Sequence, residues 1–306
     1  MSIFKRIIVA LDGSSKDEPL LKHAHEYIQK NLSEKIYFIH VQESLELPDD
    51  VVSKYPDMLS PLDESIKTTM NNLIHEHIPN IENFDYDLII EEGDPAETII
   101  KVTKRKQADL IIIGTKSIAA RTGAVARKVA SFSPCSVLFA PDLIKTTQPK
   151  ILLPLDFSES SKDCLNQIEE MASLIDTTFV KAINCYKVPT GYSTTGKSYE
   201  EVAKVLEEVS QKKLDHFVAK TKKPELVETK AILMKDGQSV AETIYETAKK
   251  EEANIIVIGS KTRTWMASML LSSTAEDLLA SDIGLPILIY KSKGKTEDIF
   301  AFFDRI

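Results

Sequence analysis

Short runs of branched apolar residues alternate with longer amphipathic segments along the chain. The first five apolar runs span residues 6–11, 35–41, 86–91, 109–113 and 136–140. A continuous apolar run of this length, ended by glycine or a polar turn, is typical of a strand buried on both faces. The segments between the runs carry apolar residues at helical spacing. The pattern predicts alternating strands and helices, and hence a parallel sheet with helices on both faces.

The same pattern occurs twice in the chain. Asp12 recurs as Asp156 and Gly93 recurs as Gly237, in both cases 144 positions later. The segment ADLIIIGTK likewise matches the later segment ANIIVIGSK. An internal repeat of this length indicates a duplicated domain rather than a solenoid. We therefore predict two tandem Rossmann-like α/β domains, residues 1–145 and 146–306, each with a five-stranded parallel sheet.

Composition and charge restrict the partners that we expect. The chain has 306 residues, of which 43% are hydrophobic and 27% charged, as in ordinary globular domains. The formal net charge of −8 lacks the basic footprint that nucleic-acid binding requires. No apolar run approaches the ~20 residues of a membrane-spanning helix, and the first run is too short for a signal peptide. With three scattered cysteines, the chain fits a reducing compartment, so we expect a cytoplasmic protein without membrane or nucleic-acid partners.

The last residues, 291–306, have no counterpart in the first copy. This C-terminal tail carries three phenylalanines and two isoleucines in its last eight positions, namely Ile299, Phe300, Phe302, Phe303 and Ile306. Such a segment is too apolar for a free, solvated end. We expect it to pack on a domain or on a partner.

The stretch from Ala253 to Ala280 has the layout of an anion site. It opens with a buried-strand pattern that ends at Gly259, continues as a loop, and resumes as a helical pattern after Ser272 and Ser273. A helix N-terminus offers unpaired backbone N–H groups and a partial positive charge, which together hold a phosphate. Strand, loop and helix in this order are also where open parallel sheets bind their ligands.

Two motifs in the second copy carry a family resemblance. The spacing Gly259-x2-Thr262-x9-Ser272-Ser273 resembles the phosphate loop of the universal stress protein family, G-x2-G-x9-G-[S/T], with Thr262 and Ser272 in place of two glycines. Residues 151–161 resemble the first strand and turn of that family. The resemblance extends over nearly the whole chain because the chain carries it twice. It implies a protein of stress adaptation that binds an adenine nucleotide, ATP or AMP, with or without magnesium.

The resemblance also implies particular site residues in the second copy. Adenosine would be held by Asp156 and by the backbone at Cys185, and the phosphates by the loop residues Gly259, Thr262, Ser272 and Ser273. The side chains of Thr262 and Ser272 limit how closely the backbone can approach a phosphate, whereas their hydroxyl groups can donate to it. A nucleotide site and a vestigial loop both stay open here.

The first copy is the weaker candidate. Its corresponding residues are Asp12, Val41, Gly114, Gly123 and Ala124. The loop between Gly114 and Gly123 is four residues shorter than its counterpart, and Ala124 replaces the hydroxyl-bearing residue. A shortened loop cannot surround a triphosphate in the same way, so a closed loop without a ligand is favoured in this copy.

Two other kinds of function remain. A nucleotide-independent scaffold would use the duplicated domain as an interaction surface, and the resemblance implies that the two domains form an intramolecular pseudo-dimer, with a homodimer also open. A weak ATP-hydrolysing enzyme ranks last, because we identify no catalytic residue by spacing. His75 and His77 stand two positions apart on a predicted helix and so face different sides, which disfavours a metal pair.

Overall fold

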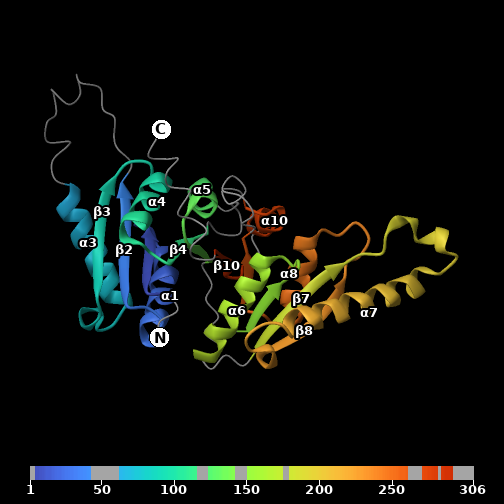
Figure 1. Ribbon diagram of the computed structural model, residues 1–306. Helices are drawn as coiled ribbons and strands as arrows, with labels where there is room; N and C mark the ends of the chain where they lie inside the picture. Colours follow the sequence, from blue (N-terminus) through green and yellow to red (C-terminus); the bar gives the residue numbers. More distant parts are fainter. Residues whose placement is uncertain are drawn as a thin grey trace, which may run out of the picture. The chain divides into compact units, whose positions relative to one another are not determined.

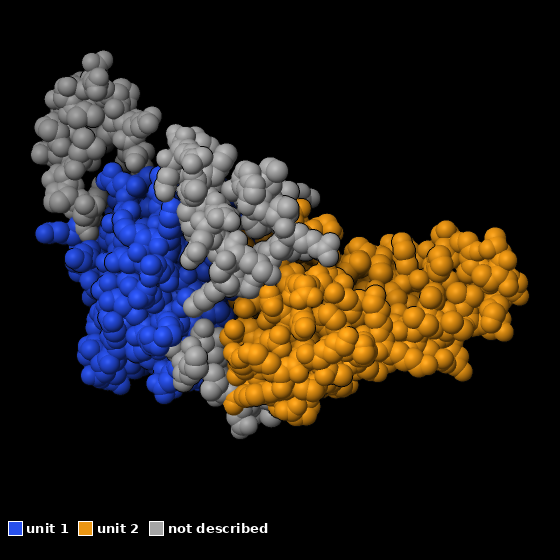
Figure 2. Space-filling view, viewed as in Figure 1, with its two compact units in different colours: residues 1–115, 123–142 blue, residues 116–122, 143–306 orange. Residues whose placement is uncertain are grey.

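The computed structural model describes residues 4–42, 62–115, 123–141, 150–174, 179–260, 271–281 and 284–291. The chain divides into two compact units (Figure 2). Unit 1 comprises residues 1–115 and 123–142, and unit 2 comprises residues 116–122 and 143–306. Thr262 and the tail residues 292–306 lie outside the described residues, so the expectations for them stay predictions.

Unit 1 is a five-stranded parallel sheet with the order β3-β2-β1-β4-β5 (Figure 1). Its strands are β1 (Arg6–Leu11), β2 (Lys35–Gln42), β3 (Tyr86–Glu92), β4 (Leu110–Gly114) and β5 (Ser136–Ala140). Its helices are α1 (Asp17–Gln29), α3 (Leu62–His77), α4 (Pro95–Lys106) and α5 (Ala124–Phe132), with a short 3-10 helix η2 (Ile81–Asn83). Helix α1 contacts α3, and α4 contacts α5, as two helical layers on the sheet.

Unit 2 repeats this plan with the order β8-β7-β6-β9-β10 and parallel pairing throughout. Its strands are β6 (Lys150–Pro154), β7 (Phe179–Tyr186), β8 (Val227–Leu233), β9 (Ile255–Gly259) and β10 (Ile287–Tyr290). Its helices are α6 (Glu159–Leu174), α7 (Tyr199–Val218), α8 (Val240–Lys250) and α10 (Ser273–Ala280), with η3 (Thr190–Thr195) and η4 (Pro224–Leu226). The predicted tandem α/β architecture is confirmed.

Local sequence explains where these elements begin. Pro95 opens α4 directly after Asp94, whose side chain accepts a hydrogen bond from the Glu97 amide at 2.8 Å. In unit 2, α8 begins with a capping box in which Ser239 and Glu242 exchange hydrogen bonds with each other's backbone amides. The central strands carry the core, since the four apolar residues of β4 before its terminal glycine are all buried. No helix of the described residues is long and apolar enough to cross a membrane.

The central strand pairs of the two units differ in length. In unit 1, β1 and β4 pair at four successive positions, as far as Ala10 opposite Ile113. In unit 2, β6 and β9 pair only at two, and the last pair is Leu152 opposite Ile256. Pro154, which ends β6, has no N–H to donate to a neighbouring strand. The backbone pairing of β6 with β9 therefore ends farther from the carboxyl ends of the strands than that of β1 with β4.

Candidate functional site

The strand order in the sheet of unit 2 changes direction between β6 and β9, which is the switch point of this sheet. From β6 the chain continues to β7 on one side, while β9 pairs with the other side. Ligands of open α/β sheets bind at such a switch point, outside the carboxyl ends of the strands. Because all strands of the unit are parallel, the ends of β6, β7 and β9 lie along the same edge of the sheet. Asp156, Cys185 and Gly259, at or after the ends of β6, β7 and β9, belong to this edge.

Asp156 follows β6 and is fixed by the turn that it begins. Its Oδ1 accepts hydrogen bonds from the Ser158 amide at 3.0 Å and from the Ser161 hydroxyl at 2.6 Å. The residue is nevertheless exposed. Its carboxylate is thus held in one orientation by the start of α6 and stays accessible to a ligand.

Phe157, the next residue, has a left-handed backbone. Its φ is +62°, a conformation that costs a non-glycine residue roughly 1–2 kcal/mol. The ring lies 5.5 Å from the ring of Phe217, and the amino group of Lys213 is 4.3 Å from its centroid. Contacts with α7 therefore hold an aromatic ring beside Asp156, in a backbone conformation that aromatic residues avoid.

The peptide groups of Cys185 face the side of β7 on which β6 has already ended. Backbone groups of successive strand residues point to opposite neighbours. The Tyr186 carbonyl accepts from the Met234 amide, on the β8 side, and the Ile183 carbonyl accepts from the Leu155 amide, on the β6 side, both at 2.8 Å. Cys185 therefore presents its N–H and C=O towards β6, beyond the last paired residue of that strand. This is the backbone edge that an adenine base needs.

The side chain of Cys185 has a different character from that of Cys164. Cys185 is only half-buried at the end of β7, while Cys164 is fully buried in α6. Burial raises the pKa of the Cys185 thiol to about 11, so the neutral thiol predominates at neutral pH. The side chain is therefore a poor nucleophile, and only its backbone concerns the candidate site.

Gly259 is required by packing within unit 2. A Cβ placed there would lie 3.0 Å from the Ser160 carbonyl oxygen and 3.4 Å from the Cys164 Cβ. The backbone of α6 thus approaches the end of β9 so closely that a side chain does not fit without a shift. The close approach of α6 is sufficient to explain a glycine at this position, and the approach of a phosphate to Gly259 stays a prediction.

Ser272 and Ser273 begin α10, and Ser272 caps it. The Ser272 hydroxyl accepts a hydrogen bond from the Ala275 amide at 3.2 Å, which satisfies one of the N–H groups that a phosphate would use. Ser273 is the first residue of the helix and is exposed. The N-terminus of α10 is present where the sequence predicted it, and the Ser272 hydroxyl already accepts a hydrogen bond from one of its backbone N–H groups.

The corresponding turn of unit 1 is built around a buried carboxylate. Asp17 accepts hydrogen bonds from the Asp12 amide at 3.0 Å and from the Gly13 amide at 2.9 Å. Burial is the largest cause that raises the pKa of Asp17 to about 6; the two backbone hydrogen bonds lower it, and the neighbouring Asp12 charge contributes a smaller increase. Asp12 itself is exposed and accepts from the Ser14 amide at 2.9 Å. The buried carboxylate of the unit 1 turn has a hydroxyl group, that of Ser161, as its counterpart in unit 2.

The other candidate residues of unit 1 are less constrained than their counterparts. A Cβ at Gly114 would come no closer than 3.8 Å to its nearest neighbour, Leu20. Gly123 precedes α5 without a side-chain cap, and Ala124 is the exposed first residue of that helix. The Gly93 amide donates a hydrogen bond to the Gln42 carbonyl, on the β3 side of β2. The N–H and C=O groups of Val41, one position earlier, therefore point towards β1. This orientation corresponds to that of Cys185 towards β6.

The described residues contain no group of three or more His, Cys, Asp or Glu side chains that could hold a metal ion. If magnesium enters the site, the nucleotide phosphates would have to supply most of its ligands, as in sites that bind this ion through substrate.

Comparisons with known proteins agree with this duplicated arrangement. The model of the universal stress protein family matches residues 3–141 and again residues 149–283. A universal stress protein of Methanothermobacter thermautotrophicus is 26% identical over 142 residues, which cover 45% of this chain and 95% of that protein. Universal stress protein MJ0577 of Methanocaldococcus jannaschii is 27% identical over 157 residues, covering 47% and 95%. A universal stress protein structure from Archaeoglobus fulgidus, 18% identical, covers 94% of this chain and 98% of its own, with a TM-score of 0.64.

Proposed function

Because the chain belongs to the universal stress protein family in both of its halves, we propose that it acts in stress adaptation by binding an adenine nucleotide, ATP or AMP, principally in unit 2. The observation that carries this proposal is the early end of the β6–β9 pairing at the switch point of the sheet. It leaves the exposed Asp156 carboxylate and the Cys185 peptide groups beside two strand ends that no longer pair.

Each part of the nucleotide has a matching group in this arrangement. The Cys185 N–H and C=O can pair with the edge of an adenine, and the Asp156 carboxylate can accept from a ribose hydroxyl. The phosphates would extend towards the N-terminus of α10, where Ser272 and Ser273 offer hydroxyl groups and the helix offers backbone N–H groups. Thr262, outside the described residues, adds a hydroxyl in the loop that leads there.

Two asparagine variants test this assignment of the site. Asp156→Asn keeps an oxygen for the Ser158 and Ser161 hydrogen bonds, so the turn is preserved while the charge is lost. Asp12→Asn is the matched control in unit 1. Titration calorimetry with ATP, with and without magnesium, should show a roughly tenfold or smaller loss of affinity for Asp156→Asn and little change for Asp12→Asn. A larger loss from Asp12→Asn would place the site in unit 1.

A nucleotide-independent scaffold is the second candidate, and two observations favour it. Gly259 is explained by the approach of α6, and the N-terminus of α10 is capped by Ser272, so neither needs a ligand. Val205 and Val209 on α7 are also exposed, with 49% and 58% of their surfaces accessible. The absence of heat and of any thermal shift at millimolar ATP with magnesium would favour this function over nucleotide binding.

A further inference from the structure

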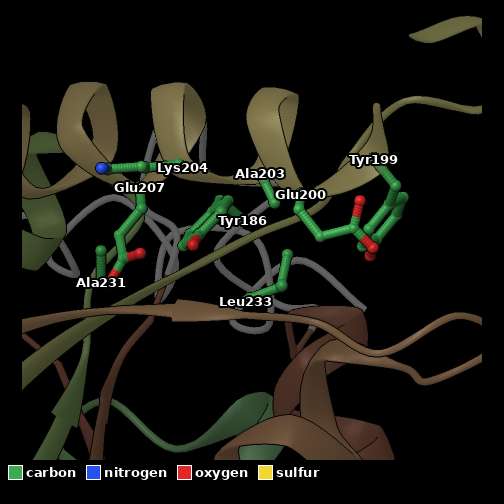
Figure 3. Close-up of a pocket in the computed structure, with 8 residues that line it drawn as sticks. All are labelled: Tyr186, Tyr199, Glu200, Ala203, Lys204, Glu207, Ala231 and Leu233. Carbon is green, nitrogen blue, oxygen red and sulfur yellow. The ribbon is translucent and has the colours of Figure 1, made fainter. Parts of the chain in front are cut away.

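Unit 2 has a pocket beside α7. It has a volume of about 550 Å³ and lies between α7 and the carboxyl halves of β7 and β8 (Figure 3). Its lining comprises Tyr186, Tyr199, Glu200, Ala203, Lys204, Glu207, Ala231 and Leu233. None of the lining residues is among the candidate residues of the nucleotide site.

Aromatic rings and carboxylates form the polar part of the pocket wall. Tyr199 contacts a further ring, that of Tyr192, edge to face at 5.5 Å. Burial raises the pKa of Tyr186, and the charge of Glu207 raises it further, so its neutral phenol faces the pocket at neutral pH. Tyrosine faces and carboxylates both attract cations, and both disfavour anions such as phosphates.

The two carboxylates have no ion-pair partner within the described part of the chain. Both side chains are exposed, and no ion pair among the described residues includes Glu200 or Glu207. Lys204, between them on α7, also lines the pocket. In Figure 3 its amino group extends along the helix, away from Glu200. With two carboxylates and one ammonium group, the lining carries a net charge of −1.

The spacing of the carboxylates determines the shape of a fitting cation. Glu200 and Glu207 are seven positions apart on one helix, or about 10 Å of axial rise. Figure 3 shows them at opposite ends of the pocket, with the Tyr186 ring between them. A single metal ion needs several oxygen ligands converging on one point, which this arrangement does not offer. A linear chain with an ammonium group at each end would place one group at each carboxylate and its apolar stem over Tyr186 and Leu233.

We propose that this pocket binds a linear aliphatic oligoamine, with Glu200 and Glu207 holding its terminal ammonium groups and Tyr186 packing against its stem. The proposal does not depend on nucleotide binding, because none of these residues belongs to the switch-point site.

Calorimetric titration of the full chain with spermidine, in the absence of nucleotide, tests the proposal. Glu200→Gln and Glu207→Gln should each weaken binding about twofold to fivefold, since each removes one exposed charge pair. Glu208→Gln is the matched control, because this exposed glutamate is on the same helix but does not line the pocket. Butylamine, with a single ammonium group, should bind much more weakly than spermidine.

The role of the ring is tested by a second pair of variants. Tyr186→Phe keeps the aromatic face and should bind spermidine nearly as well as the unmodified protein, whereas Tyr186→Leu should bind it several-fold more weakly. Circular dichroism of each variant establishes that it is folded. The proposal is overturned if spermidine does not bind, if the double variant E200Q/E207Q binds it unchanged, or if Glu208→Gln weakens binding as much as Glu207→Gln.

Discussion

The turns that follow β1 and β6 perform the same structural task with different chemistry. In unit 1, the Asp17 carboxylate accepts the amides of Asp12 and Gly13 at 3.0 and 2.9 Å. In unit 2, the corresponding residue is Ser161, whose hydroxyl donates to Asp156 at 2.6 Å. A buried carboxylate titrates near the physiological range, whereas a hydroxyl does not. The comparison shows that one fold can keep a turn while changing how that turn responds to pH.

The largest effect that we expect concerns this pH response. Burial raises the pKa of Asp17 to about 6 and lowers that of His23, also on α1, to about 4. A raised carboxyl pKa gives stability that is lost as pH rises from 3.8 to about 6, while a lowered imidazole pKa gives stability that is lost as pH falls from 6.5 to about 4. Each contribution amounts to about 3 kcal/mol, so the two oppose each other over this range.

Replacing each group by its unit 2 counterpart should separate the two contributions. With Asp17→Ser, the remaining histidine should make the free energy of unfolding rise from pH 4 to 6.5. With His23→Gln, the remaining carboxyl group should make it fall from pH 4 to 6. Urea denaturation followed by circular dichroism across this range measures both slopes. The account is wrong if the two variants show slopes of the same sign.

A smaller effect is expected from the two strand-end glycines. Gly259→Ala puts a methyl group against the Ser160 carbonyl and should lower the free energy of unfolding by about 1–3 kcal/mol. Gly114→Ala has room and should be neutral or stabilise by up to about 1 kcal/mol, because alanine loses less backbone entropy. Thermal unfolding of both variants compares them directly. Equal destabilisation would mean that the close approach of α6 does not explain Gly259.

The smallest effect is expected at the helix caps. Ser272→Gly should cost only a few tenths of a kcal/mol of stability, and Gly123→Ser should stabilise α5 by a similar amount. If phosphates reach α10 as proposed, Ser272→Gly removes one of the hydroxyl groups that would donate to them and should weaken ATP binding by a few-fold. Tighter binding in calorimetry would instead show that the Ser272 hydroxyl competes with the phosphates for the Ala275 amide.

Much of the fold followed from the sequence, because continuous apolar runs and helical spacing directly reflect burial. The strands Arg6–Leu11 and Ser136–Ala140 are found where the pattern predicted them. Gly259 shows the limit of such reasoning. A glycine at the end of a strand fits the approach of a phosphate and the approach of a helix equally well, and only the structure reveals the close packing of α6.

Other features could not be predicted because residues distant in the sequence create them. The pocket beneath α7 combines the end of β7, the first turns of α7 and the end of β8, none of which carries a recognisable motif. The hydrogen bonds of Asp17 depend on the path of a turn rather than on the residue type alone. The peptide groups of Cys185 are positioned by strand register, which the sequence does not specify.

Unit 1 has the titratable residues Asp17 and His23 where unit 2 has Ser161 and Gln167. This difference has a consequence for inheritance. In a protein with a single domain of this kind, a mutation that alters the pH dependence of the turn alters it in every molecule that the cell makes. Here the two copies are separate coding segments of one chain. Selection can therefore retain a titrating turn in one half while the other half loses it, and a single gene can maintain both.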